Sequence, residues 1–142
     1  MSAGDSRDGG TGSARPCLLI VDDDAELRES AADGLMDAGY DPLVAVDGRE
    51  ALALLHGPKR PRLILLDLMM PAMNGWEFRE ALRAEQSLGA VPILVITAAR
   101  NLGQHPIDAD AVLFKPFGLG RLVGEVQELM GQGAKGNGKG GC

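Results

Sequence analysis

Four short apolar runs constrain the fold of this chain most strongly. A polar residue stands at the carboxyl end of each run. The runs are rich in branched aliphatic residues on both alternations, which is typical of parallel strands buried on both faces. Because the carboxyl ends of parallel strands lie along one edge of a sheet, and open α/β sheets bind ligands there, the residues after the runs mark a candidate site. In chain order these polar residues are Asp22, Asp67, Thr97 and Lys115.

The segments between the strands carry helix signals. Three pairs of residues have the spacing of a capping box, in which a side chain before the helix and a glutamate three residues later satisfy free backbone groups: Asp23 with Glu26, Asp47 with Glu50, and Asn74 with Glu77. Residues 43–46 are predicted as the second strand, and the apolar spacing of residues 118–130 predicts a final amphipathic helix. Alternating strands and helices predict an α/β fold, a doubly wound five-stranded parallel sheet with helices on both faces.

The connection from Thr97 to Lys115 is short for a crossover between parallel strands. Gly103 weakens any helix there, and Pro106 ends one within about two turns. We therefore expect the fourth helix to be short or irregular.

Length and composition predict one folded domain, since 142 residues at 45% hydrophobic content leave little room for a second core. We expect a disordered leader over residues 1–16, the domain over 17–130 and a flexible glycine-rich tail over 131–142. A net charge of −6 without a basic stripe argues against nucleic acid as a partner. No run has the length of a membrane span, so a cytoplasmic protein without a membrane partner is expected.

The residues at the predicted sheet edge fit the chemistry of phosphoryl transfer. A carboxylate can attack phosphorus when the phosphoryl charge is screened and the attacking oxygen is positioned. Asp22 and Asp23 offer the hard oxygen ligands that Mg²⁺ prefers, and Asp67 is the candidate nucleophile. Lys115 and the hydroxyl of Thr97 can each stabilise a phosphoryl oxygen.

With these motifs in this order, the chain resembles the receiver domain of bacterial two-component response regulators. That family carries an acidic pair after strand 1, a phosphoacceptor Asp after strand 3 followed by Met-Pro and Gly, a Thr or Ser after strand 4, and Lys-Pro after strand 5. The corresponding residues here are Asp22-Asp23, Asp67 with Met70-Pro71 and Gly75, Thr97, and Lys115-Pro116-Phe117.

The resemblance implies a flavodoxin-like sheet of order 2-1-3-4-5 and a phosphoryl group accepted on Asp67. It implies Mg²⁺ held by Asp23, Asp67 and the backbone carbonyl of Met69, with Asp22 acting mainly through metal-bound water. Thr97 and Lys115 would contact the phosphoryl group, and the peptide before Pro116 would be cis, an isomer open to any X-Pro bond.

Two features depart from the family pattern and bear on signal output. Val112 occupies the position where the family usually has Tyr or Phe, and the segment from Thr97 to Lys115 is shorter than usual. Both lie on a face that many receivers use for output, so we expect a changed output surface. Met69 and Ala99 cannot orient a hydrolytic water by hydrogen bonding, which predicts slow self-dephosphorylation.

The expected function is a stand-alone response regulator, phosphorylated by a sensor histidine kinase or a phosphotransfer protein. It would signal to a downstream protein or pass the phosphoryl group along a relay, with no enzymatic activity beyond its own phosphorylation and slow dephosphorylation. One alternative is a receiver-like adaptor whose partner binding is independent of phosphorylation. Another is an aspartyl phosphohydrolase of the haloacid-dehalogenase type, but that family places a second Asp where this chain has Met69.

Overall fold

The computed structural model describes residues 15–85, 87–98, 102 and 106–137. Its strands form one parallel sheet in the order β2-β1-β3-β4-β5, which confirms the predicted topology. The strands are β1 (Cys17–Val21), β2 (Asp41–Ala45), β3 (Ile64–Leu66), β4 (Ile93–Thr97) and β5 (Ala111–Phe114). The helices of the described residues are α1 (Ala25–Asp37), α2 (Gly48–Leu55), α3 (Gly75–Arg83) and α4 (Leu119–Asn137).

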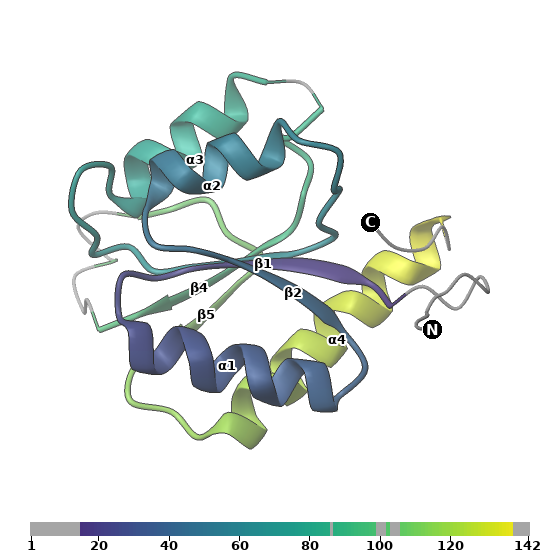
Figure 1. The fold of residues 1–142 in the computed structure, drawn as a ribbon. Helices are drawn as coiled ribbons and strands as arrows, with labels where there is room; N and C mark the ends of the chain where they lie inside the picture. The colour runs from purple at the N-terminus through teal and green to yellow at the C-terminus, as the bar shows by residue number, and fades with distance from the viewer. Residues whose placement is uncertain (1–14, 86, 99–101, 103–105, 138–142) are drawn as a thin grey trace, which may run out of the picture.

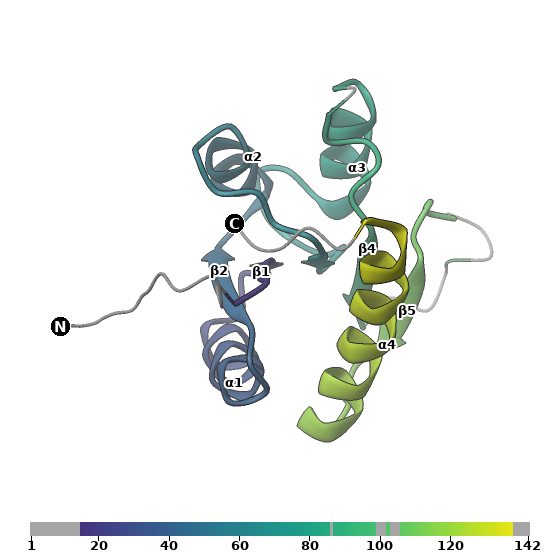
Figure 2. The ribbon, with the colours of Figure 1, turned by 90° about the vertical axis from the view of Figure 1, so that its right-hand side faces the viewer.

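The sheet lies between two layers of helices, with α2 and α3 on one face and α1 and α4 on the other (Figures 1 and 2). Successive residues of β1 show why both faces are apolar. Leu19 and Val21 pack in the cluster under α2 and α3, whereas Leu18 and Ile20 pack in the cluster under α1 and α4. All of β1 is buried, as the continuous apolar run predicts.

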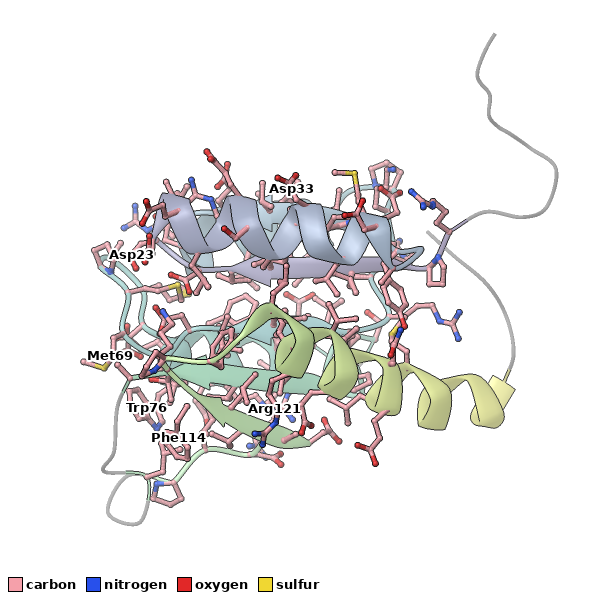
Figure 3. All side chains as sticks on the ribbon, turned by 90° about the horizontal axis from the view of Figure 1, so that it is seen from below. Asp23, Asp33, Met69, Trp76, Phe114 and Arg121 are labelled. Atoms are coloured by element: carbon pink, nitrogen blue, oxygen red, sulfur yellow. The ribbon has the colours of Figure 1, made fainter. Side chains whose placement is uncertain are left out.

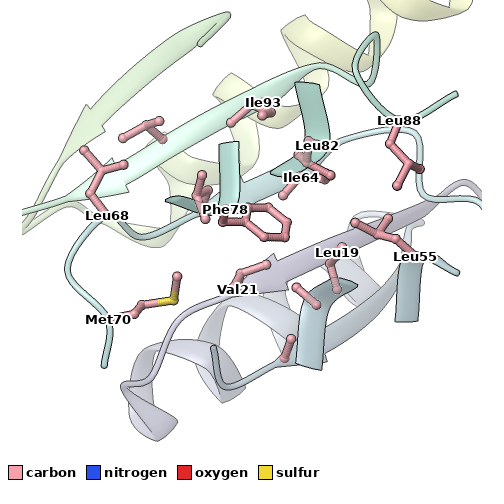
Figure 4. Packing of buried hydrophobic residues seen from close by; sticks show 14 residues of the cluster. Leu19, Val21, Leu55, Ile64, Leu68, Met70, Phe78, Leu82, Leu88 and Ile93 are labelled. Atoms are coloured by element: carbon pink, nitrogen blue, oxygen red, sulfur yellow. The ribbon is translucent and has the colours of Figure 1, made fainter. Parts of the chain in front are cut away.

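Phe78 is the largest fully buried side chain and lies at the centre of the first cluster (Figure 4). It projects from α3 toward Val21 and Ile64 on the central strands, with Leu82 one turn further along the same helix face. Burying a side chain of this size stabilises the fold by about 1.5–3 kcal/mol. The helix that follows the Asp67 loop is therefore fixed firmly against the sheet.

The N-caps of α2 and α3 are the predicted residues, and the N-cap of α1 is not. Asn74 and Glu77 form a complete capping box, and Asp47 accepts a hydrogen bond from the backbone N–H of Glu50. At α1, however, the N-cap is Asp24, whose carboxylate accepts from the backbone N–H groups of Glu26 and Leu27. Asp23, which the sequence placed in this role, is free of the cap and remains exposed at the sheet edge.

The bounds of one predicted strand and one predicted helix differ in the structure. The second strand spans Asp41–Ala45 rather than 43–46, because the proline at its second position is compatible with an edge strand. The last helix continues to Asn137, beyond the expected end at residue 130. No proline interrupts that stretch, so each further residue can add one helical hydrogen bond. Residues 1–14 of the expected leader (1–16) and the last five residues of the expected tail (131–142) lie outside the described part of the chain.

The crossover between β4 and β5 has no helix in its described residues, which are 98, 102 and 106–110. Residues 99–101 and 103–105 lie outside the described part, so the predicted short fourth helix is judged only on the remainder. Pro106 lacks a backbone donor, which is consistent with the absence of a helix in residues 106–110. No described helix is both long and apolar enough to cross a membrane.

Candidate functional site

The polar residues predicted from the four runs gather at the carboxyl edge of the sheet. Asp22 directly follows β1, Asp67 directly follows β3, Thr97 is the last residue of β4, and Lys115 directly follows β5. These strands are neighbours in the order β1-β3-β4-β5, so the four residues follow one another across the sheet. Figure 3 shows Asp23 and Met69 at this same end of the molecule.

Three carboxylates form an acidic cluster. One oxygen from each of Asp22, Asp23 and Asp67 lies within 4.8 Å of the other two. Asp22 is fully buried and Asp67 is 3% exposed, whereas Asp23 is exposed. The cluster therefore has a buried floor and one side open to solvent.

Backbone hydrogen bonds hold the two buried carboxylates. Oδ1 of Asp22 accepts from the N–H of Asp24 at 2.9 Å, and Oδ1 of Asp67 accepts from the N–H of Met69 at 3.1 Å. The backbone carbonyl of Asp22 accepts from Nη1 of Arg28 at 2.9 Å. Sequence reasoning missed Arg28, although its place on the first turn of α1, just after the acidic pair, could have suggested this contact.

Lys115 bridges the two buried carboxylates. Its Nζ lies 3.0 Å from Oδ2 of Asp22 and 3.3 Å from Oδ2 of Asp67. Its backbone N–H donates to the carbonyl of Thr97 at 2.8 Å, which anchors the end of β5 to the end of β4. The Lys115–Pro116 peptide is cis, as the resemblance implied.

Burial and charge alter the protonation of this group of residues. Burial first, and the neighbouring charge of Asp22 second, raise the pKa of Asp67 to about 6, although the Met69 N–H and Lys115 oppose the rise. Burial lowers the pKa of Lys115, but its hydrogen bonds and ion pairs with Asp22 and Asp67 outweigh burial and leave that pKa raised. Lys115 is therefore cationic, and Asp67 is mainly ionised only above about pH 6.

The loop after Asp67 is shaped by a close approach at Gly75. The N–H of Gly75 donates to the carbonyl of Leu68 at 3.0 Å. A Cβ at this position would lie 2.5 Å from Leu68 Cδ2 and 2.7 Å from Leu68 Cα, so only glycine fits without a shift of the backbone. The start of α3 can thus lie directly against the residue that follows the candidate nucleophile.

The acidic cluster fits a divalent cation of the Mg²⁺ type. Mg²⁺ binds through one to a few carboxylates and keeps several waters, which matches a buried pair beside an open side at Asp23. A cation would also offset the repulsion that raises the pKa of Asp67. The side chain of Met69, 57% exposed, takes no part in such a site, so only its backbone carbonyl is a candidate ligand.

Thr97 and Val112 occupy the same side of the sheet as α2 and α3. Thr97 is fully buried at the end of β4, and its partner in the β4–β5 register is Phe114. Val112 is partly buried against the cluster under α2 and α3, and Phe114 is 37% exposed. Ala99, the other residue of the slow-dephosphorylation prediction, lies outside the described residues.

Known proteins are similar to this chain in sequence and in fold. The family model of the response regulator receiver domain matches residues 18–127. Response regulator MprA of Mycolicibacterium vanbaalenii is 38% identical over 117 residues, which cover 80% of this chain and 49% of MprA. The DNA-binding response regulator MtrA of Mycobacterium tuberculosis is 40% identical over 118 residues, covering 80% of this chain and 50% of MtrA. The chain spans about half the length of the curated relatives it matches.

A solved structure agrees with the sequence relatives. The chemotaxis protein CheY4 of Vibrio cholerae superposes with a TM-score of 0.74 at 35% identity, over 81% of this chain and 98% of that one. The family match covers all four strand ends that build the acidic site, together with both helix layers. The chain belongs to the family of response regulator receiver domains.

Proposed function

We propose that the chain accepts a phosphoryl group on Asp67 from the phosphohistidine of a histidine kinase or phosphotransfer protein. The observation that carries the proposal is the setting of Asp67. Its carboxylate is almost fully buried, one oxygen is held by the Met69 N–H, and the other faces the ammonium group of Lys115. A carboxylate fixed in this way presents an oriented oxygen to an incoming phosphorus atom.

In the proposed transfer an oxygen of Asp67 forms the new O–P bond while the N–P bond of phosphohistidine breaks. The electron pair of that bond returns to the imidazole nitrogen, and the product on this chain is an acyl phosphate. Mg²⁺, held by Asp22, Asp23, Asp67 and the carbonyl of Met69, would screen the phosphoryl charge when bound. Lys115 stabilises a phosphoryl oxygen, and the Thr97 hydroxyl donates to another.

Incubation with acetyl phosphate and Mg²⁺, followed by intact mass spectrometry, tests the proposal. We expect the chain to gain one phosphoryl group and Asp67→Asn to gain none. Asp33→Asn is the matched control, since Asp33 is an exposed aspartate of α1 whose change leaves the acidic cluster intact (Figure 3). A wild-type chain that remains unmodified, or an Asp67→Asn chain that is modified as fully as wild type, would contradict the proposal.

We expect the acyl phosphate to persist for minutes or longer. The Met69 side chain beside Asp67 has only a weak thioether acceptor, so it cannot orient an attacking water. The decay of the phosphorylated mass after removal of acetyl phosphate measures this lifetime. Decay within seconds would show that another group activates the water.

An adaptor whose partner binding ignores phosphorylation is the second candidate function. The described part of the crossover before β5 has no helix, and Val112 has no ring to move when Thr97 engages a phosphoryl group. Both features reduce the change at the output face that is expected when Asp67 is phosphorylated. Partner pull-downs with the phosphorylated chain and with Asp67→Asn separate the two: equal recovery supports the adaptor, and a large difference supports phosphorylation-dependent signalling.

A further inference from the structure

We propose that Arg79 is a positioning residue for phosphoryl transfer, acting through Asp108 to hold β5 and thereby Lys115. This inference rests on the proposed function of Lys115. Arg79 lies on α3, outside the acidic site, and Asp108 lies near the end of the crossover that leads into β5.

Arg79 joins three segments of the chain. Its Nε donates to the backbone carbonyl of Asp108 at 3.0 Å, and its Nη2 lies 3.0 Å from Oδ2 of the same residue. Its Nη1 donates to the carbonyl of Gly89, between α3 and β4, at 3.5 Å. The guanidinium group thus fastens the crossover to α3 through both the backbone and the side chain of Asp108.

Burial distinguishes Arg79 from the other cation at this point. The Arg79 side chain is 11% exposed, whereas that of Asp108 is 57% exposed, so the pair is buried on the guanidinium side only. Arg83 also pairs with Oδ2 of Asp108, at 3.2 Å, but its side chain is 51% exposed. Exposed ion pairs contribute little, so the Arg79 contact is the stronger of the two mainly because it adds a hydrogen bond to the Asp108 backbone carbonyl.

A second aspartate continues the attachment toward β5. Oδ2 of Asp110 accepts from the N–H of Ile93 at 2.8 Å, and the N–H of Asp110 donates to the carbonyl of Ile93 at 2.9 Å. Two aspartates on either side of Ala109 therefore tie the last residues of the crossover to α3 and to the start of β4. The strand that follows begins at the next residue.

β5 needs this support because it is an edge strand with one neighbour in the sheet. Of its four residues Leu113 alone is buried. Lys115 directly follows the strand, and its Nζ must reach across β4 and β3 to Asp67 and Asp22. A small displacement of β5 along β4 would move the ammonium group away from the phosphoryl position, and misplacements of this size cost large factors in rate.

The test compares Arg79→Gln and Asp108→Asn with Arg83→Gln as the matched control. At saturating Mg²⁺ we expect the first two to lower the rate of phosphorylation by acetyl phosphate about tenfold, and the control to change it less than about twofold. Asp108→Asn keeps the size of the side chain and the backbone carbonyl, so it remains informative if Arg79→Gln folds poorly. Unchanged rates in both variants would overturn the inference.

A double-mutant cycle separates positioning of Lys115 from a general structural role. In a Lys115→Gln background we expect Arg79→Gln to have no further effect on the rate, because the group that it positions is absent. An equal slowing in both backgrounds would show that Arg79 acts by another route and would overturn the inference.

Amide hydrogen exchange gives a readout that does not depend on phosphorylation. We expect Arg79→Gln to speed exchange at the Lys115 N–H, which donates to Thr97, and not at the Asp67 N–H, which donates to Val21. Equal protection of Lys115 in the two chains would refute the role of Arg79 even if the wild type were never phosphorylated. A wild type without a phosphoryl adduct but with this exchange pattern would refute the proposed function alone.

Discussion

Burial and the neighbouring charge of Asp22 both disfavour the ionised form of Asp67. Its pKa rises from 3.8 to about 6, so the folded chain binds more protons than the unfolded chain between these values. Stability in the absence of metal therefore falls as pH rises through this window and levels off above it. The full effect corresponds to about 3 kcal/mol, which solvent at the open side of the site reduces to about 1–2 kcal/mol.

We accordingly expect Asp67→Asn to be more stable than wild type in EDTA near neutral pH, by about 1–2 kcal/mol. The difference should vanish below about pH 4, where the wild-type carboxyl is protonated in both states. Urea unfolding measured across this pH range checks the prediction. Asp33→Asn should follow the wild-type curve. An Asp67→Asn chain that is less stable than wild type at neutral pH would show that the contacts of the Asp67 carboxylate stabilise the fold by more than its burial costs.

Ala72 is a second residue with an unfavourable setting, because its φ of 65° lies in the left-handed region. We expect Ala72→Gly to raise the free energy of unfolding by about 0.5–1 kcal/mol, since glycine adopts this conformation without strain. Ala53→Gly, at an exposed position within α2, should lower it by about 1 kcal/mol. Chemical denaturation of both variants tests whether the backbone conformation decides the sign of the change in the free energy of unfolding when alanine is replaced by glycine.

The residues of the site were predictable from the sequence to different degrees. Asp22, Asp67, Thr97 and Lys115 end or follow buried strands, so strand pairing alone brings them together. The capping-box spacing of Asp23 with Glu26 did not identify the cap of α1, because two adjacent carboxylates offer the same capping chemistry and the backbone path places Asp24 at the cap. The Arg79–Asp108 contact joins residues 29 positions apart and leaves no local pattern to detect.

Among the elements, α3 depends most on one glycine. A Cβ at Gly75 meets Leu68 Cα at 2.7 Å and the carbonyl of Asp67 at 3.1 Å, and neither backbone atom can move independently of the site. We expect Gly75→Ala to destabilise the chain by about 1–3 kcal/mol and to slow phosphorylation of Asp67, because overpacking displaces the loop that carries it.

Gly34 in α1 provides the matched control for that prediction. The atoms nearest to its added Cβ belong to the side chain of Leu119, at 2.7 Å, and that side chain is 43% exposed and can turn away. Alanine also has the higher helix propensity, so Gly34→Ala should change stability little and leave phosphorylation intact. Thermal unfolding and acetyl phosphate labelling of Gly75→Ala and Gly34→Ala test this comparison. Equal losses of stability and of phosphorylation in the two variants would mean that backbone crowding near Asp67 has no special effect.

The elements with periodic sequence were predicted well, and the irregular ones were not. Buried strands and capped helices follow from local patterns, as β1 and the Asn74–Glu77 box show. The path of the crossover before β5 depends on tertiary hydrogen bonds from α3 and β4, which no helical or strand period encodes. The end of α4 was set too early because a glycine-rich composition was taken as a stop, although glycine weakens a helix by only about 1 kcal/mol per residue.

At the scale of the whole molecule, the acidic cluster links metal binding to folding. Its carboxylates follow β1 and β3, two adjacent strands at the centre of the sheet, and the unfolded chain does not hold them together. A cation that binds only the folded state stabilises it by mass action, by about 2.7 kcal/mol at a concentration 100 times its Kd. The gain should be smaller near pH 5, since Mg²⁺ must then displace the proton from Asp67.

Thermal unfolding with Mg²⁺, compared with NaCl at the same ionic strength, measures this coupling at the two pH values. We expect Asp23→Asn to reduce the stabilisation by Mg²⁺ near neutral pH while leaving metal-free stability almost unchanged, because Asp23 is exposed and caps no helix. Asp24→Asn should keep the response to Mg²⁺, since asparagine caps a helix about as well as aspartate. If Mg²⁺ stabilises Asp23→Asn and Asp67→Asn as much as wild type, the ion binds elsewhere on this acidic chain. If both variants lose the stabilisation, the carboxylates after β1 and β3 bind the ion that stabilises the fold, and the phosphoacceptor candidate is one of its ligands.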